Sequence, residues 1–177
     1  MQVIVIATTP STSEPLSNLL NSMRGYDKYP IVILSDYSFE VGKINFVKEN
    51  MPNIDEFVLL HDTCEVKNTK LFDLAFCNPL SVSFSASPQP FGAYLGKYQK
   101  KVLDLISIPS AKTKLDSVNF EETFNTEYII KAKQIDTISN PLINRDVFVQ
   151  KFGKRCMKLE NEYLIKYKSY WSRSQVY

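Results

Sequence analysis

The first 65 residues alternate between short apolar runs and segments whose apolar residues recur every three or four positions. Short apolar runs bounded by polar residues are typical of buried strands, and the chain has three: residues 3–7, 30–34 and 57–60. Leu16, Leu19, Leu20 and Met23 follow the first run at helical spacing, and Val41, Ile44 and Val47 follow the second. The order strand–helix–strand–helix–strand predicts an α/β fold, as a single domain with a mostly parallel sheet flanked by helices.

The rest of the chain has a less regular pattern. Phe120, Phe124 and Tyr128 stand at four-residue steps, so they can form one helix face or simply part of the core. The other elements expected here are a helix after Asn68, a strand over residues 80–86, a helix that opens at 95–98 and stops before Pro109, and a short helix from Asn144 or Asp146 to Gly153.

Polar residues follow each predicted strand of the first half. Thr8 and Thr9 follow the first, Asp36 the second, and Asp62 and Glu65 the third. Because ligands of open α/β sheets bind at the carboxyl ends of the strands, we expect a site there. Carboxylates suit Mg²⁺ or Mn²⁺, so Asp62 and Glu65 are candidate metal ligands. Alternatively, Asp62 forms a turn or caps the following helix.

Composition narrows the class of protein. The 177 residues, 44% hydrophobic and 23% charged, fit one soluble domain, and no apolar run approaches the roughly 18 residues of a membrane span. Residues 1–6 have no basic start and no cleavage site of small residues after them, so they are predicted to form a strand and not a signal peptide. Three widely spaced cysteines and one histidine predict buried thiols in a reducing, cytoplasmic setting and argue against a zinc site. Neither a G-x-G-x-x-G sequence nor a P-loop sequence occurs.

The end of the chain is basic and rich in aromatic residues. Residues 151–177 hold seven Lys and Arg against two Glu. Such a segment can bind phosphates or another anionic partner, although a solvated basic face is the common explanation.

Two segments resemble small glycosyltransferase-A-type enzymes of phages and bacteria. Residues 57–66, a strand that leads into Asp62-Thr63-Cys64-Glu65, resemble the place where these enzymes carry an Asp-x-Asp motif, and residues 152–171 resemble their C-terminal segment. The spacing Asp-x-x-Glu departs from the motif, and no His follows His61 to serve as a late metal ligand. The resemblance implies a glycosyltransferase-A-like fold with a Rossmann-like nucleotide-binding half (residues 1–90) and an acceptor-side half (residues 91–177).

The resemblance also implies a reaction: transfer of a sugar from a nucleotide-diphosphate sugar to a glycan or a modified DNA base. Asp62 and Glu65 would hold a divalent cation, Mn²⁺ or Mg²⁺, or the hydroxyls of the donor sugar. Without a metal, lysines would supply the positive charge, and an inverting enzyme would need a carboxylate base. The implied donor-binding residues are Ala7, Thr8, Thr9, Asp36, Lys97, Lys166, Lys168 and Trp171, with Tyr167 as a further stacking residue; the candidate bases are Glu121, Glu122 and Asp116.

Two alternatives remain open from the sequence. One is a non-catalytic nucleotide- or glycan-binding module of the same fold, and the other is a protein whose basic ending binds nucleic acid. Trp171 can equally be a core residue. Because the chain is short, the acceptor site can be completed by a second subunit, which would make the protein a homo-oligomer.

Overall fold

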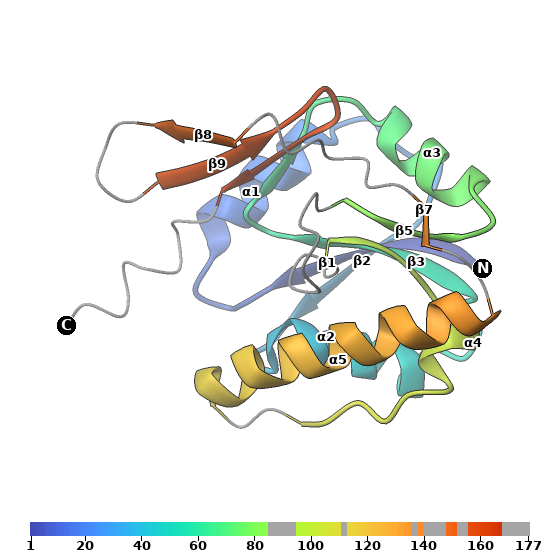
Figure 1. The fold of residues 1–177 in the computed structure, drawn as a ribbon. Coiled ribbons are helices and arrows are strands. Elements are labelled where there is room, and N and C mark those ends of the chain that lie inside the picture. The colour runs from blue at the N-terminus through green and yellow to red at the C-terminus, as the bar shows by residue number, and fades with distance from the viewer. Residues whose placement is uncertain (85–94, 111–112, 136–137, 140–147, 152–155, 168–177) are drawn as a thin grey trace.

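The computed structural model describes residues 1–84, 95–110, 113–135, 138–139, 148–151 and 156–167, apart from the side chains of Ser83, of several residues in helix α5, of strands β7 and β8 and of all residues in strand β9 except Glu160. It contains two sheets and two layers of helices (Figure 1). The elements in chain order are β1 (Gln2–Thr8), α1 (Ser13–Ser22), β2 (Ile31–Ser35), α2 (Phe39–Asn50), β3 (Glu56–His61), β4 (Cys64–Val66), α3 (Lys70–Cys77), β5 (Ser81–Ser83), β6 (Gly96–Gln99), α4 (Lys100–Leu103), α5 (Lys114–Ile135), β7 (Ile138–Ser139), β8 (Phe148–Lys151), β9 (Cys156–Glu160) and β10 (Leu164–Tyr167).

The larger sheet has the strand order β2-β1-β3-β6-β5-β7. Strand β1 lies in its parallel part, paired with β2 on one side and β3 on the other. Strand β6 is antiparallel to both β3 and β5, whereas β5 and β7 are parallel. The α/β class is therefore confirmed, but the sheet is mixed beyond β3 and not mostly parallel throughout.

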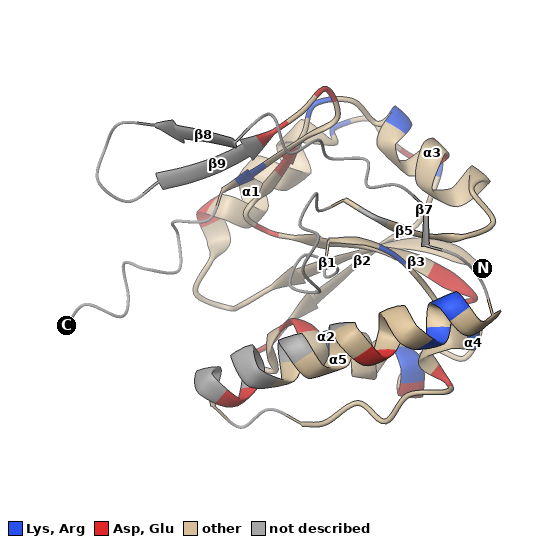
Figure 2. Cartoon of the chain, viewed as in Figure 1, with Lys and Arg blue, Asp and Glu red and all other residues tan. Residues whose placement is uncertain are grey.

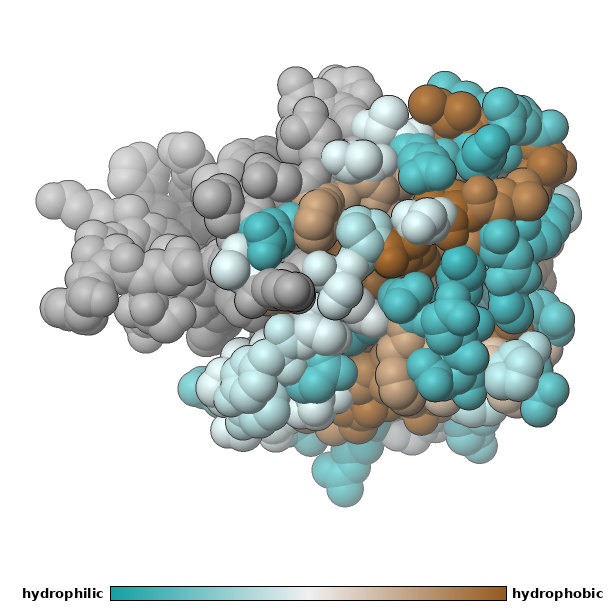
Figure 3. Space-filling view, turned by 90° about the horizontal axis from the view of Figure 1, so that it is seen from below, coloured by the Kyte–Doolittle hydropathy of each residue, from teal (hydrophilic) through white to brown (hydrophobic). Residues whose placement is uncertain are grey.

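Alternate residues of β1 and β3 enter two separate hydrophobic clusters. Val3, Val5 and Ala7 pack with α2, α4 and α5, whereas Ile4 and Ile6 pack with α1 and α3. This two-sided burial explains why both strands appear in the sequence as continuous apolar runs. In Figure 1 the two helical layers accordingly lie above and below the larger sheet. The outer face of the layer with α2 and α5 mixes apolar and hydrophilic side chains (Figure 3).

The second sheet joins the end of the described chain to its middle. Its order is β4-β10-β9-β8, and each pair is antiparallel. Strand β4 begins three residues after β3 ends, so the chain passes from one sheet into the other through the turn at Asp62 and Thr63.

One predicted helix begins later than expected and is short, and another is a strand where the structure describes it. Residues 96–99 form strand β6, and the helix α4 that follows it is only four residues long. All four residues of β6 are buried, so the strand lacks the alternation that marks a half-exposed one. Where a short helix was expected before Gly153, residues 148–151 form β8, which is stabilised by pairing with β9. The strand predicted over residues 80–86 is described as β5, and its last two positions lie outside the described residues.

Two other expectations for the middle of the chain are confirmed, the helix after Asn68 and the core role of Phe124 and Tyr128. Helix α3 follows Asn68, and α5 carries Phe124 and Tyr128 into the core beside Tyr98. Within the described part of the chain, no helix has the length and apolar character needed to span a membrane. Charged residues of both signs are spread over the helices instead of gathering on one face (Figure 2).

Candidate functional site

The turn between β3 and β4 lies where the two sheets meet. The backbone N–H of Asp62 donates to the carbonyl oxygen of Ala7 at 3.0 Å, which extends the pairing of β3 with β1 by one residue. The carbonyl oxygen of Thr63 accepts from the backbone N–H of Tyr167 at 2.9 Å, which ties the turn to β10. Hydrogen bonds from both sheets therefore fix the backbone of this turn.

The Asp62 carboxylate is buried against threonine hydroxyls. Asp62 is 2% exposed, and its Oδ2 accepts hydrogen bonds from Thr8 Oγ1 at 2.9 Å and from Thr12 Oγ1. Thr12 directly precedes α1, and its hydroxyl also accepts from the backbone N–H of Thr9 at 3.2 Å. Asp62 therefore holds the loop between β1 and α1 in place, and it does not cap the helix that follows it in the sequence.

His61 lies beside a lysine that comes from the far end of the chain. Lys166 Nζ is 3.0 Å from His61 Nδ1 and also donates to Thr63 Oγ1. An ammonium group only donates, so Nδ1 accepts and the ring proton is on Nε2. Burial, and then the charges of Lys166 and Lys43, hold the pKa of His61 well below its ordinary value. The imidazole is therefore neutral near pH 7.

Asp36 and Lys43 form an ion pair at the end of β2. Lys43 is 2% exposed, and its Nζ lies 3.1 Å from the carbonyl oxygen and 3.3 Å from Oδ1 of Asp36. Burial alone would raise the pKa of Asp36, but hydrogen bonds from Ser38 and the charge of Lys43 outweigh it and lower that pKa. Phe39, the first residue of α2, has a φ of 59°, a conformation that side chains rarely adopt. Such strain often accompanies functional sites.

These groups make a region of mixed charge at the carboxyl ends of β1, β2 and β3. Among the described residues it includes four carboxylates and two ammonium groups: Asp36, Glu40, Asp62, Glu65, Lys43 and Lys166. Helices α1 and α2 both begin at this edge, and helix N-termini favour anionic ligand groups. The region therefore offers donors for phosphate oxygens and acceptors for hydroxyl groups.

The two predicted metal ligands interact with different parts of the structure. Glu65 Oε2 lies 3.4 Å from the hydroxyl group of Tyr167, whereas Asp62 binds Thr8 and Thr12. Cys64 and Val66, the neighbours of Glu65 in β4, belong to the hydrophobic cluster that also contains residues of α1. Because side chains alternate along a strand, Glu65 points away from that cluster. Among the described residues, no group of three or more His, Cys, Asp and Glu is placed to hold a metal ion. Asp62 and Glu65 therefore have different hydrogen-bond partners, and the cation and its two ligands stay a prediction.

The remaining predicted residues lie elsewhere. Lys97 is buried in β6, and its Nζ is 2.9 Å from Glu56 Oε2, at the amino end of β3, so the structure does not bring it to Asp62. Glu121 and Glu122 lie on α5, but the structure does not describe their side chains. Lys168 and Trp171 lie outside the described residues.

Two residues of this region had no role in the sequence-based site. Lys43 stands four residues before Val47, hence on the apolar face of α2, and a lysine at such a position is a signal of a buried ion pair. His61 directly precedes Asp62, but its contact with Lys166 depends on the pairing of β4 with β10 and leaves no local trace in the sequence.

No protein-family model and no curated protein matches the sequence. Among solved structures, A197 from STIV has a TM-score of 0.47 and 14% identity, over 94% of each chain. A glycosyltransferase involved in the glycosylation of the major capsid of PBCV-1 has a TM-score of 0.45 and 14% identity, over 78% of this chain and 82% of that one. Both TM-scores lie below 0.5, so the proposal that follows does not rest on these likenesses.

Proposed function

We propose that the protein is a glycosyltransferase that binds a nucleotide-diphosphate sugar at the carboxyl ends of β1, β2 and β3. One observation carries the proposal. The two segments that resemble glycosyltransferases are 103 to 105 residues apart where they meet, and they contact each other here, through Lys166 on one side and His61 and Thr63 on the other. Thr8, Thr9 and Asp36, expected to bind the nucleoside, lie at the ends of the neighbouring strands.

The described residues support distinct roles in donor binding. The Asp36 side chain is 46% exposed although it pairs with Lys43, so a carboxylate oxygen can accept hydrogen bonds from ribose hydroxyls. Lys166 and the N-termini of α1 and α2 supply positive charge for the diphosphate. Asp62 keeps the loop between β1 and α1 in position and accepts from hydroxyls, and Glu65 remains a candidate for binding the donor sugar.

In the proposed reaction an acceptor hydroxyl oxygen forms a bond with the anomeric carbon of the donor sugar, and the bond from that carbon to the diphosphate breaks. The hydroxyl proton passes to a carboxylate, for which Glu121 and Glu122 remain the candidates in an inverting enzyme. Negative charge builds on the leaving diphosphate, where a fixed ammonium such as that of Lys166 is most effective. A divalent cation, if bound, would neutralise the same charge. The acceptor is a glycan or a modified DNA base.

Calorimetry with UDP, GDP, CDP and dTDP, each with and without Mn²⁺, tests donor binding. We expect one of them to bind, and Lys166→Met to weaken that binding by about tenfold or more, because a hydrogen bond to a charged group contributes about 1.5–3 kcal/mol. Lys133→Met, at an exposed position of α5, is the matched control and should bind as the unaltered protein does. Absence of binding to all four diphosphates would refute the proposal.

Hydrolysis of the matching nucleotide sugar separates an enzyme from a non-catalytic module of the same fold. An enzyme should release free sugar slowly even without its acceptor, and Lys166→Met should reduce that release. Diphosphate binding without any release of sugar, in the presence of glycan and DNA acceptors, would favour the non-catalytic module.

A further inference from the structure

Strand β2 forms one edge of the larger sheet. It pairs with β1 on one side, and no other strand among the described residues pairs with its outer side. The backbone N–H of Ile4 donates to the carbonyl oxygen of Pro30 at 2.9 Å, and Ile4 stands opposite Ile31. Because a parallel ladder uses every second residue of a strand, this register directs the backbone groups of Ile31, Ile33 and Ser35 away from β1.

This edge lacks the features that usually protect a sheet edge. Charged side chains, prolines and bulges prevent edge strands from pairing with another chain. Residues 29–35 include no charged residue, and Pro30, which has no N–H, is one of the residues directed toward β1. Ile33, at the centre of β2, is 43% exposed. The outer side of β2 therefore offers unprotected backbone groups and an exposed apolar side chain to a further strand.

Apolar side chains flank the edge on both faces of the sheet. Val32 and Leu34 pack against the hydrophobic cluster that contains α2, whereas Ile31 packs against the cluster on the opposite face. Phe46 of α2 is 43% exposed. It stands three residues after Lys43, so it lies on the side of α2 that contacts the end of β2. A strand added at this edge would cover apolar surface on either face.

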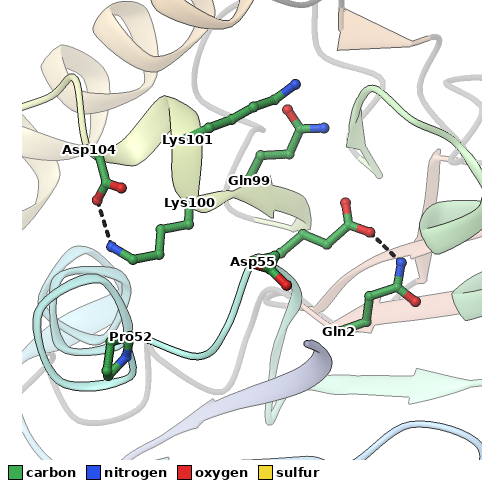
Figure 4. Close-up of a pocket in the computed structure, with 8 residues that line it drawn as sticks. Gln2, Pro52, Asp55, Gln99, Lys100, Lys101 and Asp104 are labelled. Carbon is green, nitrogen blue, oxygen red and sulfur yellow. Dashed lines mark hydrogen bonds and ion pairs between the residues drawn. The ribbon is translucent and has the colours of Figure 1, made fainter.

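The amino end of the larger sheet has a different character. A pocket of about 550 Å³ there is lined mainly by charged and amide side chains (Figure 4). Several of them bond to one another: Lys100 Nζ lies 2.7 Å from Asp104 Oδ1, and Gln2 Nε2 donates to Glu56 Oε1 at 2.5 Å. These polar groups have each other as partners, whereas the outer side of β2 requires a second strand to supply them.

We propose that β2 pairs antiparallel with β2 of a second copy of this chain, about a two-fold axis at Ile33. Each Ile33 would then exchange both backbone hydrogen bonds with its counterpart, and Ile31 would do the same with Ser35 of the other copy. Val32 would stand opposite Leu34 on the other face. The same surface patch serves both copies, which is the requirement of a closed two-fold dimer.

The charges of the chain favour a second copy as the partner. In this arrangement the charged residues that flank β2 meet uncharged ones, since Asp36 stands level with Pro30, and Lys28 with Ser38, of the other copy. The net charge of each copy is only +2, so long-range repulsion between copies is small. A strand of another protein would also meet the backbone groups, but a second copy meets them and matches the apolar side chains of β2.

This inference does not rest on the proposed function. Antiparallel pairing points the carboxyl ends of the two β2 strands in opposite directions. The two regions proposed to bind a donor therefore lie at opposite ends of the joined strands, and dimer formation and diphosphate binding can be measured separately.

Sedimentation equilibrium over a range of protein concentrations tests the dimer. We expect the mass to rise from the 20.4 kDa of one chain to twice that value. Ile33→Lys should raise the dissociation constant at least tenfold, because two lysines would stand directly opposite each other. Ile33 is exposed and its backbone groups do not bond to β1, so the variant should fold, which circular dichroism checks. Ile130→Lys, at an exposed position of α5, is the matched control and should dimerise as the unaltered protein does.

Hydrogen exchange of the unaltered protein, followed by NMR, tests the strand pairing without any substitution. The amide protons of Ile31, Ile33 and Ser35 should exchange more slowly as the protein concentration rises. Those of Val32 and Leu34, which face β1, should be slow at every concentration.

Four results would overturn the inference. They are a mass of one chain at a concentration of about 1 mM, assemblies larger than a dimer, a dimer that Ile33→Lys does not weaken, and exchange at Ile31, Ile33 and Ser35 that does not depend on concentration. The last result would mean either that another segment of the same chain covers β2 or that nothing pairs with it.

Discussion

Replacing Asp62 should cost much of the stability of the protein, because the carboxylate joins β3 to the loop before α1. Asp62→Ala removes the carboxylate oxygen Oδ2, which is buried and accepts hydrogen bonds from the hydroxyl groups of Thr8 and Thr12. Hydrogen bonds to a charged group contribute about 1.5–3 kcal/mol each, but the variant no longer buries a charge, so we expect a net loss of about 2–4 kcal/mol. For a chain of this length the melting temperature should fall by roughly 5–15 °C.

Urea unfolding of a double-mutant cycle separates this network from a general loss of packing. Thr12→Val removes one hydroxyl at almost constant volume, and we expect a coupling free energy with Asp62→Ala of about 1 kcal/mol or more. Asp27→Ala, at an exposed position, is the control and should change the unfolding free energy by no more than about 0.5 kcal/mol. Additivity of the Asp62 and Thr12 replacements within about 0.5 kcal/mol would refute the network.

Three further predictions concern single side chains. The NMR signals of His61, the one histidine of the chain, should report a neutral ring well below pH 6.5. Because the imidazole of the unfolded chain takes up a proton near pH 6.5, the free energy of unfolding should be highest above that pH and fall below it, by up to about 1.4 kcal/mol per pH unit. The variant His61→Gln should lose this pH dependence. In the native protein iodoacetamide should modify the exposed Cys77 and spare Cys64, a buried thiol whose pKa is raised by burial; peptide mass spectrometry that finds equal labelling would contradict the structure. Gly42→Ala would place a Cβ 2.6 Å from Ser38 Cβ, so thermal unfolding should show a loss of about 1–3 kcal/mol, and an unchanged melting temperature would contradict this packing.

The first half of the fold could be predicted because burial leaves a direct trace in its sequence. Residues of β1 and β3 are buried on both faces of the sheet, which requires continuous apolar runs, and α1 shows apolar residues at helical spacing. Polar residues after these runs correctly indicated the edge at which Thr8, Asp36 and Asp62 lie.

The second half could not be predicted in the same way because its strands depend on distant partners. Strand β4 is three residues long and pairs with β10, about 100 residues later in the chain. In β6 the burial of Lys97 depends on Glu56, a partner in another strand, so the local pattern resembles the start of a helix. Likewise, only the tertiary structure shows that Glu65 and Asp62 have different partners. The position of these polar residues at one edge of the sheet could therefore be predicted from the sequence, whereas the contacts among them could not.

The central claim is that a nucleotide-sugar donor binds at the carboxyl ends of β1, β2 and β3. Mapping the amide shifts caused by the best-binding nucleoside diphosphate tests it most directly. We predict saturable shifts at residues 8–12, 36–40 and 61–65 that weaken in Lys166→Met and persist in Lys133→Met. Shifts confined to the opposite end of the sheet, where β1 and β3 begin, or saturation that is unchanged in Lys166→Met, would contradict the claim.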